Sequence, residues 1–599
     1  MAESMKGLHR TARCAELGES YIGKTVCMMG WVQKSRNKGG LIFTDLRDRS
    51  GILQILFEEN ECGAEVFEKA SKLRAEFVIA VEGELRSRGK DANASLATGS
   101  VELVAKSLRI LAEAETPPFP IEEDSKTKED LRLKYRYLDL RRPDLAQRIM
   151  TRARLSQLIR AFLSQVGFLE IETPTLIKST PEGARDFLVP SRLHQGSFYA
   201  LPQSPQLLKQ LLMVSGMDRY FQLARCYRDE DLRADRQPEF TQVDMELSFV
   251  DMEDVLEVNE RLLQYIFKEI CQVEIPLPLQ RMTWIDAMEN YGSDKPDLRF
   301  DMHFYDISDL LRDTGFKVFR NVLDNGGIVK AITVKGDAAI PRRELDGLVD
   351  YVGNYGAKGL AWIGLNKDGS LKCQITKFLG EDKIREIGKF CEAENGDLIL
   401  IIADKPKVVA QALGELRLEM ARRMNLIDEN EFCFRWVTDF PMFEYSEEDK
   451  RWVAEHHPFT APRDEDVQYL LTDPSKVYAK AYDMVLNGVE AGGGSLRIYQ
   501  EELQEKVFKA IGITHEEAQE KFGFLLDAFR YGAPPHAGIA LGLDRLVMLM
   551  LRLGSIRDVI AFPKTQSAID QMTQAPSEVV DMQLKELHIR VDVKKEKNY

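Results

Sequence analysis

The chain has 599 residues, 44% of them hydrophobic and 30% charged, which is typical of a globular protein with several domains rather than a single core. Its net charge of −15 argues against a non-specific polyanion binder, so a nucleic-acid partner would require a localised basic surface. No apolar run approaches the roughly 18 residues of a membrane span, and residues 1–20 are too polar for a signal peptide. The eight cysteines lack metal-ligand spacing and are expected to be reduced thiols. We therefore expect a cytoplasmic protein without a membrane partner.

Short strands dominate the first domain, which we place at residues 1–112. They are expected at 26–32, 41–46, 52–57, 77–85 and 101–111, with a helix at 64–73. Five strands with a helix between the third and the fourth predict an OB barrel. Phe43 shares one side of its strand with Asp45, and Gln54 points away from its apolar neighbours, so both are candidates for reading bases. Phe43 can equally belong to the core.

Shifts in composition divide the rest of the chain. An acidic, proline-rich stretch precedes a long helix that begins at Pro143, and a region of separate βα units interrupts a strand-rich pattern. The predicted fold class is α+β multidomain, in which an antiparallel-sheet domain carries an inserted α/β domain. The expected parts are a hinge (113–140), the first part of the sheet domain (141–295), the insertion (296–430), the second part of the sheet domain (431–565) and a C-terminal extension (566–599).

A helix with a leucine stripe is expected after Ser204, which can cap it. Gln206 and Lys209 are three residues apart, so they share a face of this helix. A lysine beside leucines often only extends along apolar surface, and the helix by itself leaves its role open.

Two predicted strands, at 220–230 and 240–250, carry a dense polar pattern. In the second, apolar residues alternate with Gln242, Asp244 and Glu246, so one face is apolar and the other forms hydrogen bonds. The polar face can be merely solvated. It can also bind an anion and an ammonium group together, because it combines a guanidinium, carboxylates and amides.

A hairpin turn at Asn487-Gly488 places Val485 opposite Glu490, which brings Asp483 and Glu490 together diagonally. Two converging carboxylates repel each other unless a cation lies between them, and oxygen ligands suit Mg²⁺. The alternative is one carboxylate on each side of a solvated hairpin.

Three further features concern charged or titratable side chains. Arg497 would point away from Glu490 by strict alternation, so a role for it requires a bulge in the glycine run 492–494. Arg545 is expected near the amino end of a helix, where its charge adds to the helix dipole and suits a phosphate. His456 and His457 are adjacent on an extended segment, so their side chains point oppositely and a two-histidine metal site is not expected.

Several stretches carry recognisable motifs. They are 167–174, 203–210, Tyr227-Arg228-Asp229-Glu230 continuing to Gln242, 538–546, and Gly30-Trp31-Val32 continuing to Gln54. These resemble the first motif, the aspartate-binding segment, the second and third motifs and the anticodon-binding domain of class II aminoacyl-tRNA synthetases. The match is to the bacterial-type aspartyl-tRNA synthetases of class IIb, whose GAD-type insertion domain the region 296–430 also resembles.

This resemblance implies ATP-dependent attachment of L-aspartate to tRNA(Asp) through an aspartyl-adenylate, by a homodimer that uses ATP as substrate and Mg²⁺ as cofactor. It implies Arg228, at the α-phosphate, and Arg545 as catalytic residues. The implied contacts are Arg228, Glu230, Gln237, Glu490 and Arg545 for ATP; Glu182, Ser204, Gln206, Lys209, Asp244, His456 and Arg497 for aspartate; Asp483 and Glu490 for the metal; and Arg36, Phe43 and Gln54 for the tRNA anticodon.

Three alternatives stay open. A non-discriminating enzyme would also aspartylate tRNA(Asn), and a related enzyme would activate asparagine or lysine. An OB-fold nucleic-acid-binding protein could carry an inactive synthetase body. Lys209 and Arg497 together favour an acidic substrate.

Overall fold

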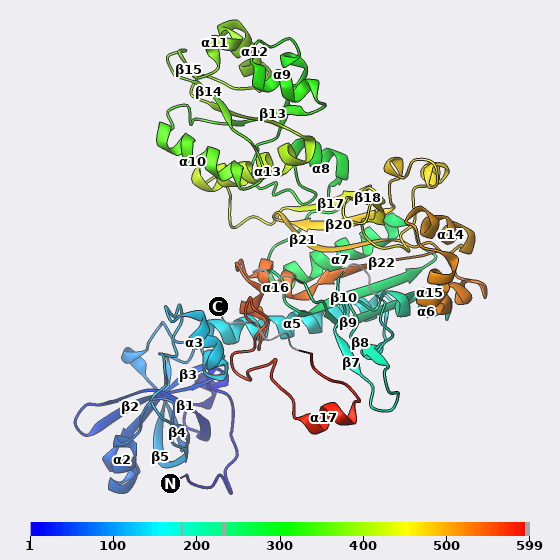
Figure 1. The fold of residues 1–599 in the computed structure, drawn as a ribbon. Helices are drawn as coiled ribbons and strands as arrows, with labels where there is room; N and C mark the ends of the chain where they lie inside the picture. Colours follow the sequence, from blue (N-terminus) through cyan, green and yellow to red (C-terminus); the bar gives the residue numbers. More distant parts are fainter. Residues whose placement is uncertain (1, 181–183, 231–234, 593–599) are drawn as a thin grey trace. The chain divides into compact units, whose positions relative to one another are not determined.

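The computed structural model describes residues 2–180, 184–230 and 235–592. The chain divides into two compact units, Met1–Ala153 with Arg557–Glu578 and Arg154–Ile556 with Val579–Tyr599 (Figure 1). No helix in these described ranges is long and apolar enough to cross a membrane. The domain boundaries proposed from the sequence stay predictions.

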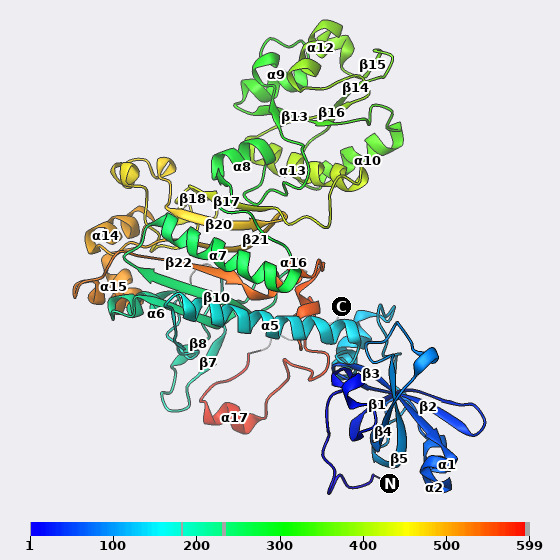
Figure 2. The ribbon, with the colours of Figure 1, turned by 180° about the vertical axis from the view of Figure 1, so that it is seen from behind.

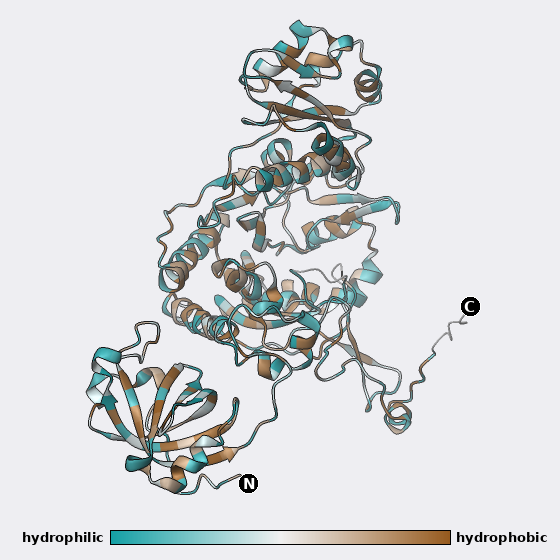
Figure 3. Cartoon of the chain, turned by 90° about the vertical axis from the view of Figure 1, so that its left-hand side faces the viewer, coloured by the Kyte–Doolittle hydropathy of each residue, from teal (hydrophilic) through white to brown (hydrophobic). Residues whose placement is uncertain are grey.

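The first unit contains a closed barrel with the strand order β1-β2-β3-β5-β4, which confirms the predicted OB barrel. Apolar residues that alternate along the strands, such as Val26, Leu46 and Leu53, fill its interior. Figure 3 shows hydrophobic colour along these strands. The elements are β1 (Thr25–Asn37), β2 (Leu41–Asp48), β3 (Gly51–Glu58), α1 (Glu59–Cys62), α2 (Ala64–Ser71), β4 (Val78–Ser87) and β5 (Val101–Ala112).

The stretch predicted as a hinge is partly helical, with α3 (Glu129–Lys134) and α4 (Arg136–Asp139) in its second half. The carboxylate of Asp139 is fully buried and accepts hydrogen bonds from Arg136 at 2.7 Å and Arg142 at 2.9 Å. This buried ion-pair cluster orders the end of a segment whose composition indicated only a linker.

The second unit is built on a sheet whose described strands follow the order β11-β17-β20-β21-β22-β10-β9-β6. The pairs from β17 to β9 are antiparallel, whereas β11 and β6 join the two edges in parallel. Helices α7 (Met252–Cys271) and α16 (Leu543–Met550) lie along one face (Figure 2). The strands are β6 (Leu169–Glu170), β9 (Arg219–Tyr227), β10 (Glu239–Ser248), β11 (Arg281–Thr283), β17 (Phe434–Thr438), β20 (Ala481–Leu486), β21 (Val489–Leu496) and β22 (His536–Gly542).

Further helices and two small strand pairs complete this part of the chain. Helix α5 (Pro143–Gln165) begins in the first unit and continues into the second after Ala153, and the other helices are α6 (Gln206–Val214), α8 (Trp284–Tyr291), α14 (Glu501–Ala510), α15 (His515–Phe529) and α17 (Asp581–Glu586). The small pairs are β7 (Leu188–Pro190) with β8 (Phe198–Ala200), and β18 (Phe443–Ser446) with β19 (Arg451–Ala454).

The alternation predicted for the second strand of the polar pair is confirmed in β10. Val243 and Met245 are fully buried on the apolar side, and Asp244 and Glu246 on the other side are also fully buried. The polar face is therefore enclosed rather than solvated, which excludes the simpler interpretation of this strand.

The predicted register of the β20–β21 hairpin is also confirmed, since Val485 pairs with Glu490. The register then shifts, because Met484 pairs with Gly492 and leaves Ala491 as the extra residue. The bulge that Arg497 requires is thus present. We had predicted it within the glycine run, but it lies just before that run, at Ala491. The glycines pair with both β20 and β22, and a Cβ at Gly494 would lie 2.0 Å from the carbonyl oxygen of Gly538.

The insertion alternates helices and strands, as predicted. Its strands follow the order β12-β13-β16-β14-β15, and each of these pairs is antiparallel. The elements are β12 (Tyr305–Asp306), α9 (Lys317–Asp324), β13 (Ile328–Val334), α10 (Arg342–Gly353), β14 (Ala361–Leu365), β15 (Leu371–Cys373), α11 (Thr376–Leu379), α12 (Glu381–Phe390), β16 (Leu398–Asp404) and α13 (Pro406–Arg423).

Candidate active site

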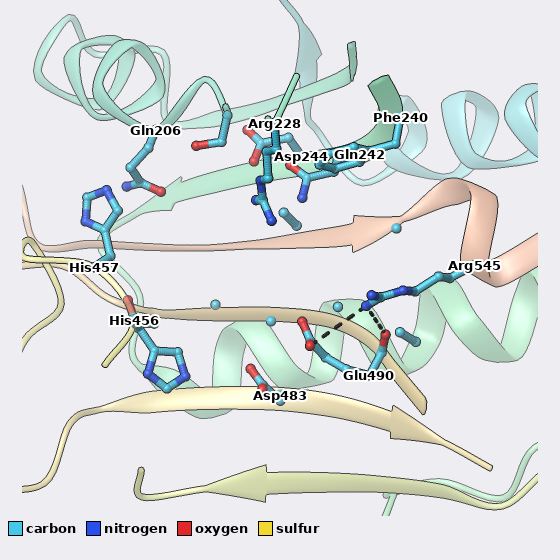
Figure 4. A pocket seen from close by; sticks show the side chains of 18 of the residues that line it. Gln206, Arg228, Phe240, Gln242, Asp244, His456, His457, Asp483, Glu490 and Arg545 are labelled. Atoms are coloured by element: carbon cyan, nitrogen blue, oxygen red, sulfur yellow. Dashed lines mark hydrogen bonds and ion pairs between the residues drawn. The ribbon is translucent and has the colours of Figure 1, made fainter. Parts of the chain in front are cut away.

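A cavity of about 620 Å³ lies over the polar side of β10, β21 and β22. It collects the substrate and metal residues predicted from the sequence within the described chain, as Figure 4 shows for those that it labels. Glu182 lies outside the described residues. The predicted residues that line the cavity are Ser204, Gln206, Lys209, Arg228, Glu230, Gln237, Asp244, His456, Asp483, Glu490, Arg497 and Arg545.

One end of the cavity borders a buried cluster of two cations and two anions, three of which line the cavity wall. Lys209 Nζ lies 2.7 Å from Asp244 Oδ1 and 3.2 Å from Glu246 Oε2. Arg497 Nε donates to Glu246 Oε1 at 3.0 Å, and Arg497 Nη1 donates to Ser495 Oγ at 2.7 Å. Glu246 therefore joins the two cations to each other, and the four charges balance before any ligand binds. We call these four residues the charge cluster.

Sequence reasoning did not single out Glu246. The signal for it was present, because Glu246 continues the polar alternation of Gln242 and Asp244 on β10. What the sequence could not indicate is the approach of Lys209 from α6 and of Arg497 from the end of β21.

The surroundings shift the pKa values of the two carboxylates of the cluster in opposite directions. Burial alone would raise the pKa of Glu246, but Arg497 and Lys209 outweigh it and the pKa lies below its usual value. Burial raises the pKa of Asp244 despite the nearby Lys209. Asp244 Oδ2 is buried and has no hydrogen-bond partner among the described residues, although the hydroxyl of Tyr220 lies near this carboxylate. An ammonium group at Oδ2 would complete its hydrogen bonding.

At the other end of the cavity, Glu490 lies 3.8 Å from Arg545 in an ion pair, whereas Asp483 has no ion pair among the described residues. Burial, with the negative charges of Glu490 and Asp294, raises the pKa of Asp483 well above its usual value. The described residues form no group of three or more potential metal ligands. Two hard carboxylate ligands fit Mg²⁺, which commonly takes one or two protein carboxylates and completes its shell with water and substrate phosphates.

Two arginines face this second end. Arg545 lies in the first turn of α16, as predicted, and its Nη1 donates to the backbone oxygen of Glu490 at 2.9 Å. Its Nη2 donates to Asp235 Oδ2 at 3.3 Å. The guanidinium of Arg228 lies over the ring of Phe240, 5.1 Å from its centroid. Asp235 and Phe240 also line the cavity, although we had not predicted them as contacts.

Glu230 and the histidines also border the cavity. Glu230 accepts a hydrogen bond from Arg236 at 2.9 Å. Both His456 and His457 line the wall, and Figure 4 shows His457 beside Gln206 and His456 toward Asp483. The side chains diverge, as predicted for neighbours on an extended segment. Burial lowers the pKa of His456.

The predicted anticodon residues meet on the first unit. Arg36 pairs with Phe43 across β1 and β2, and Asp45 pairs with Gln54 across β2 and β3, so these residues share one face of the barrel. Phe43 is half-buried and outside the barrel core. Arg36 donates to Asp45 at 3.0 Å, and Gln54 donates to Glu102 at 2.9 Å.

Comparison with known proteins agrees with this architecture. The chain matches the family of tRNA synthetases class II (D, K and N) over residues 128–566, and the OB-fold nucleic acid binding domain over residues 26–111. The solved structure of aspartyl tRNA synthetase from Entamoeba histolytica is 21% identical, covers 93% of this chain and 92% of its own, and has a TM-score of 0.57, which supports the fold. The fold and the matched residues define a class II tRNA synthetase.

Closer relatives narrow the group. The chain is 62% identical over 589 residues to the aspartate–tRNA(Asp/Asn) ligase of Lachnoclostridium phytofermentans, with 98% of each chain covered. It is 58% identical over 591 residues to the aspartate–tRNA ligase of Agathobacter rectalis, with 99% of each covered. The chain belongs to the bacterial aspartyl-tRNA synthetases.

Proposed function

We propose that this chain activates L-aspartate with ATP and transfers it from aspartyl-adenylate to the terminal ribose of tRNA(Asp). The observation that carries the proposal is the charge cluster. It offers an arginine and a lysine to a side-chain carboxylate, and it leaves one buried oxygen of Asp244 for an ammonium group. An acidic amino acid carries both a side-chain carboxylate and an ammonium group.

The residues around aspartate hold and orient it. Arg497 has N–H donors beyond those that Glu246 and Ser495 accept in the described chain, and these bind the side-chain carboxylate. Asp244, with Ser204 and Gln206, binds the ammonium group. Asparagine is rejected because its amide nitrogen would face guanidinium donors, and a buried unpaired charged donor costs about 1–3 kcal/mol or more.

At the other end, the chain's own groups stabilise charge on ATP. Arg228 binds the α-phosphate and Arg545 the γ-phosphate, while Glu230, Gln237 and Phe240 contact the adenosine part. Asp483 and Glu490 would hold Mg²⁺, which neutralises phosphate charge when it is bound. The α-carboxylate of aspartate then attacks the α-phosphorus in line, and the bond from that phosphorus to the leaving pyrophosphate breaks. Catalysis rests on positioning and electrostatics, and no side chain acts as nucleophile.

ATP–pyrophosphate exchange with aspartate, asparagine and lysine in turn tests the activation step. We expect exchange with aspartate alone. Exchange driven by asparagine or lysine would instead support a related enzyme that activates that amino acid. No exchange with any of the three would favour the nucleic-acid-binding alternative.

Aspartylation of tRNA(Asn) is a second candidate, because a relative that is 62% identical is named for both tRNAs. Charging of tRNA(Asp) and tRNA(Asn) transcripts with aspartate separates the two candidates. Arg36, Phe43 and Gln54 are the proposed anticodon contacts. We expect Phe43→Leu to weaken charging by roughly 1–3 kcal/mol in kcat/KM for tRNA, because the ring stacks a base, and to leave amino-acid exchange unchanged.

We also propose that the chain works as a cytoplasmic homodimer. The edge strand β6 and the segment after it expose Leu169 and Leu176, each 50% accessible, next to Pro174, which cannot extend a sheet ladder. Sedimentation velocity should give twice the chain mass of 68.3 kDa. A monomer at micromolar concentration would contradict the dimer.

A further inference from the structure

A line of buried polar groups lies behind the proposed ammonium site. Gln206 Nε2 lies 3.2 Å from Gln210 Oε1, one turn further along α6. Gln210 Nε2 lies 3.0 Å from His536 Nε2, and His536 Nδ1 lies 2.8 Å from the backbone oxygen of Pro534. Gln210 is fully buried, and His536 is 2% exposed. The line therefore runs from the cavity wall into the protein, and Gln210 and His536 do not line the cavity.

The direction of each hydrogen bond follows from donor chemistry. The oxygen of Pro534 can only accept, so His536 Nδ1 carries a proton and donates. The amide nitrogen of Gln210 can only donate, so His536 Nε2 is unprotonated and accepts. Gln210 Oε1 is then left to accept from Gln206 Nε2, and the oxygen of Gln206 is directed to the cavity, where Figure 4 shows this side chain.

The same line has one other self-consistent arrangement. If His536 is protonated on both nitrogens, its Nε2 donates, so Gln210 must turn to present its oxygen. Gln206 must then turn as well, and its amide nitrogen replaces the oxygen in the cavity. An N–H group there would repel an ammonium group that the oxygen attracts.

The surroundings of His536 favour the first arrangement. Burial, together with the positive charges of Arg497 and Lys209, lowers the pKa of His536 below its usual value, although Glu246 and the Pro534 carbonyl act in the opposite direction. The imidazole is therefore neutral at physiological pH.

We propose that Gln210 and His536 are positioning residues that set the amide orientation of Gln206, so that the cavity presents an oxygen to the ammonium group of aspartate. The inference rests on the proposed function, because it places that ammonium group against Gln206. It adds a specificity element that acts through a substrate contact and does not itself touch the substrate.

The test compares aspartate with succinate, which has the same two carboxylates and lacks the ammonium group. In Gln210→Met the orientation of Gln206 is no longer fixed, so we expect the KM for aspartate in pyrophosphate exchange to rise about tenfold. The kcat, the KM for ATP and the inhibition constant of succinate at pH 7.5 should stay within twofold. Gln264→Met, a glutamine on α7 that donates to Ile275, is the matched control.

Two further variants separate orientation from packing. In Gln210→Glu, the carboxylate still accepts from Gln206, so the KM for aspartate should return to within about threefold of the original. In His536→Gln the amide cannot titrate, so the rise in aspartate KM that we expect in the original chain at pH values below the ordinary histidine pKa should disappear.

An equal loss of aspartate and succinate binding in Gln210→Met would overturn the inference, since it would indicate general loosening. An unchanged KM in Gln210→Met would also overturn it, and so would an unaltered pH profile in His536→Gln. Absence of aspartate-driven exchange in the original chain would instead remove the proposed function on which the inference depends.

Discussion

The two ends of the cavity handle charge in opposite ways. At the aspartate end, Lys209 and Arg497 are already paired with Asp244 and Glu246, and the cluster is buried. At the ATP end, Asp483 is forced toward its protonated form by burial and by neighbouring carboxylates. The first end is balanced by ion pairs before a ligand arrives, whereas at the second end Asp483 has no ion-pair partner among the described residues.

This difference matches the ligands that we propose. Aspartate brings one ammonium group and two carboxylates, and these meet donors and acceptors that are already in place. Mg²⁺ and ATP contribute several charges of both signs, so a site for them can include the unpaired carboxylate of Asp483 together with arginines that bind phosphate. The aspartate end is therefore preorganised, whereas the ATP end depends on its ligands for charge compensation.

The largest effect on stability is expected at the balanced end. Glu246→Gln leaves Lys209 and Arg497 without their shared carboxylate, and breaking a buried ion pair costs roughly 3–5 kcal/mol. Urea unfolding followed by circular dichroism measures the loss. Glu239→Gln is the control, because Glu239 pairs with Arg225 near the protein surface and such pairs contribute about 1 kcal/mol or less. Equal effects of the two substitutions would show that the cluster is not special.

Removal of the Arg497 side chain should have the largest effect on kcat/KM for aspartate. Arg497→Ala deletes the donor group for the side-chain carboxylate and leaves Glu246 with one cation, so kcat/KM for aspartate should fall on the order of 10²- to 10³-fold. Pyrophosphate exchange measures it, with Arg225→Ala as an exposed arginine control. The KM for ATP should change far less, and an equal rise in both KM values would contradict the separation of the two ends.

The smallest effect on stability is expected for substitution of Asp483. Its sign is opposite to that of Glu246→Gln, because the variant should be more stable than the original chain. The folded-state pKa of Asp483 is raised, so its carboxyl group costs stability as pH rises through the unfolded value toward neutrality. Asp483→Asn removes this cost, and the melting temperature without Mg²⁺ and ATP should rise by a few degrees at pH 7.5. The variant should at the same time lose exchange activity. A lower melting temperature would show that Asp483 is already compensated within the chain.

Local patterns predicted a good part of the fold, for identifiable reasons. The OB barrel follows from short strands with a helix in a fixed position, and the β20–β21 register follows from Asn487-Gly488, because a two-residue turn specifies which residues face each other. A bulge was predicted only because Arg497 would otherwise point away from Glu490. Its place at Ala491 depends on how β21 pairs with both β20 and β22, which the hairpin sequence does not contain.

The site was predicted as a set of residues but not as a network. The resemblance named Lys209 with Arg497, and Asp244 apart from them, whereas their connection through Glu246 requires α6, β10 and β21 to meet. The orientation of Gln206 by His536 is likewise a tertiary property, since 330 residues separate them in the sequence. Glu182 lies outside the described residues, and its contact with aspartate stays a prediction.

The most direct test of the central claim is isothermal titration calorimetry of aspartate and of ATP, each with and without Mg²⁺. The account predicts that aspartate binds with the same affinity in both conditions, because its end of the cavity is already balanced. It also predicts that Mg²⁺ strengthens ATP binding in the original chain and has a much smaller effect in Asp483→Asn. Aspartate affinity that depends on Mg²⁺ as strongly as ATP affinity does would contradict the account.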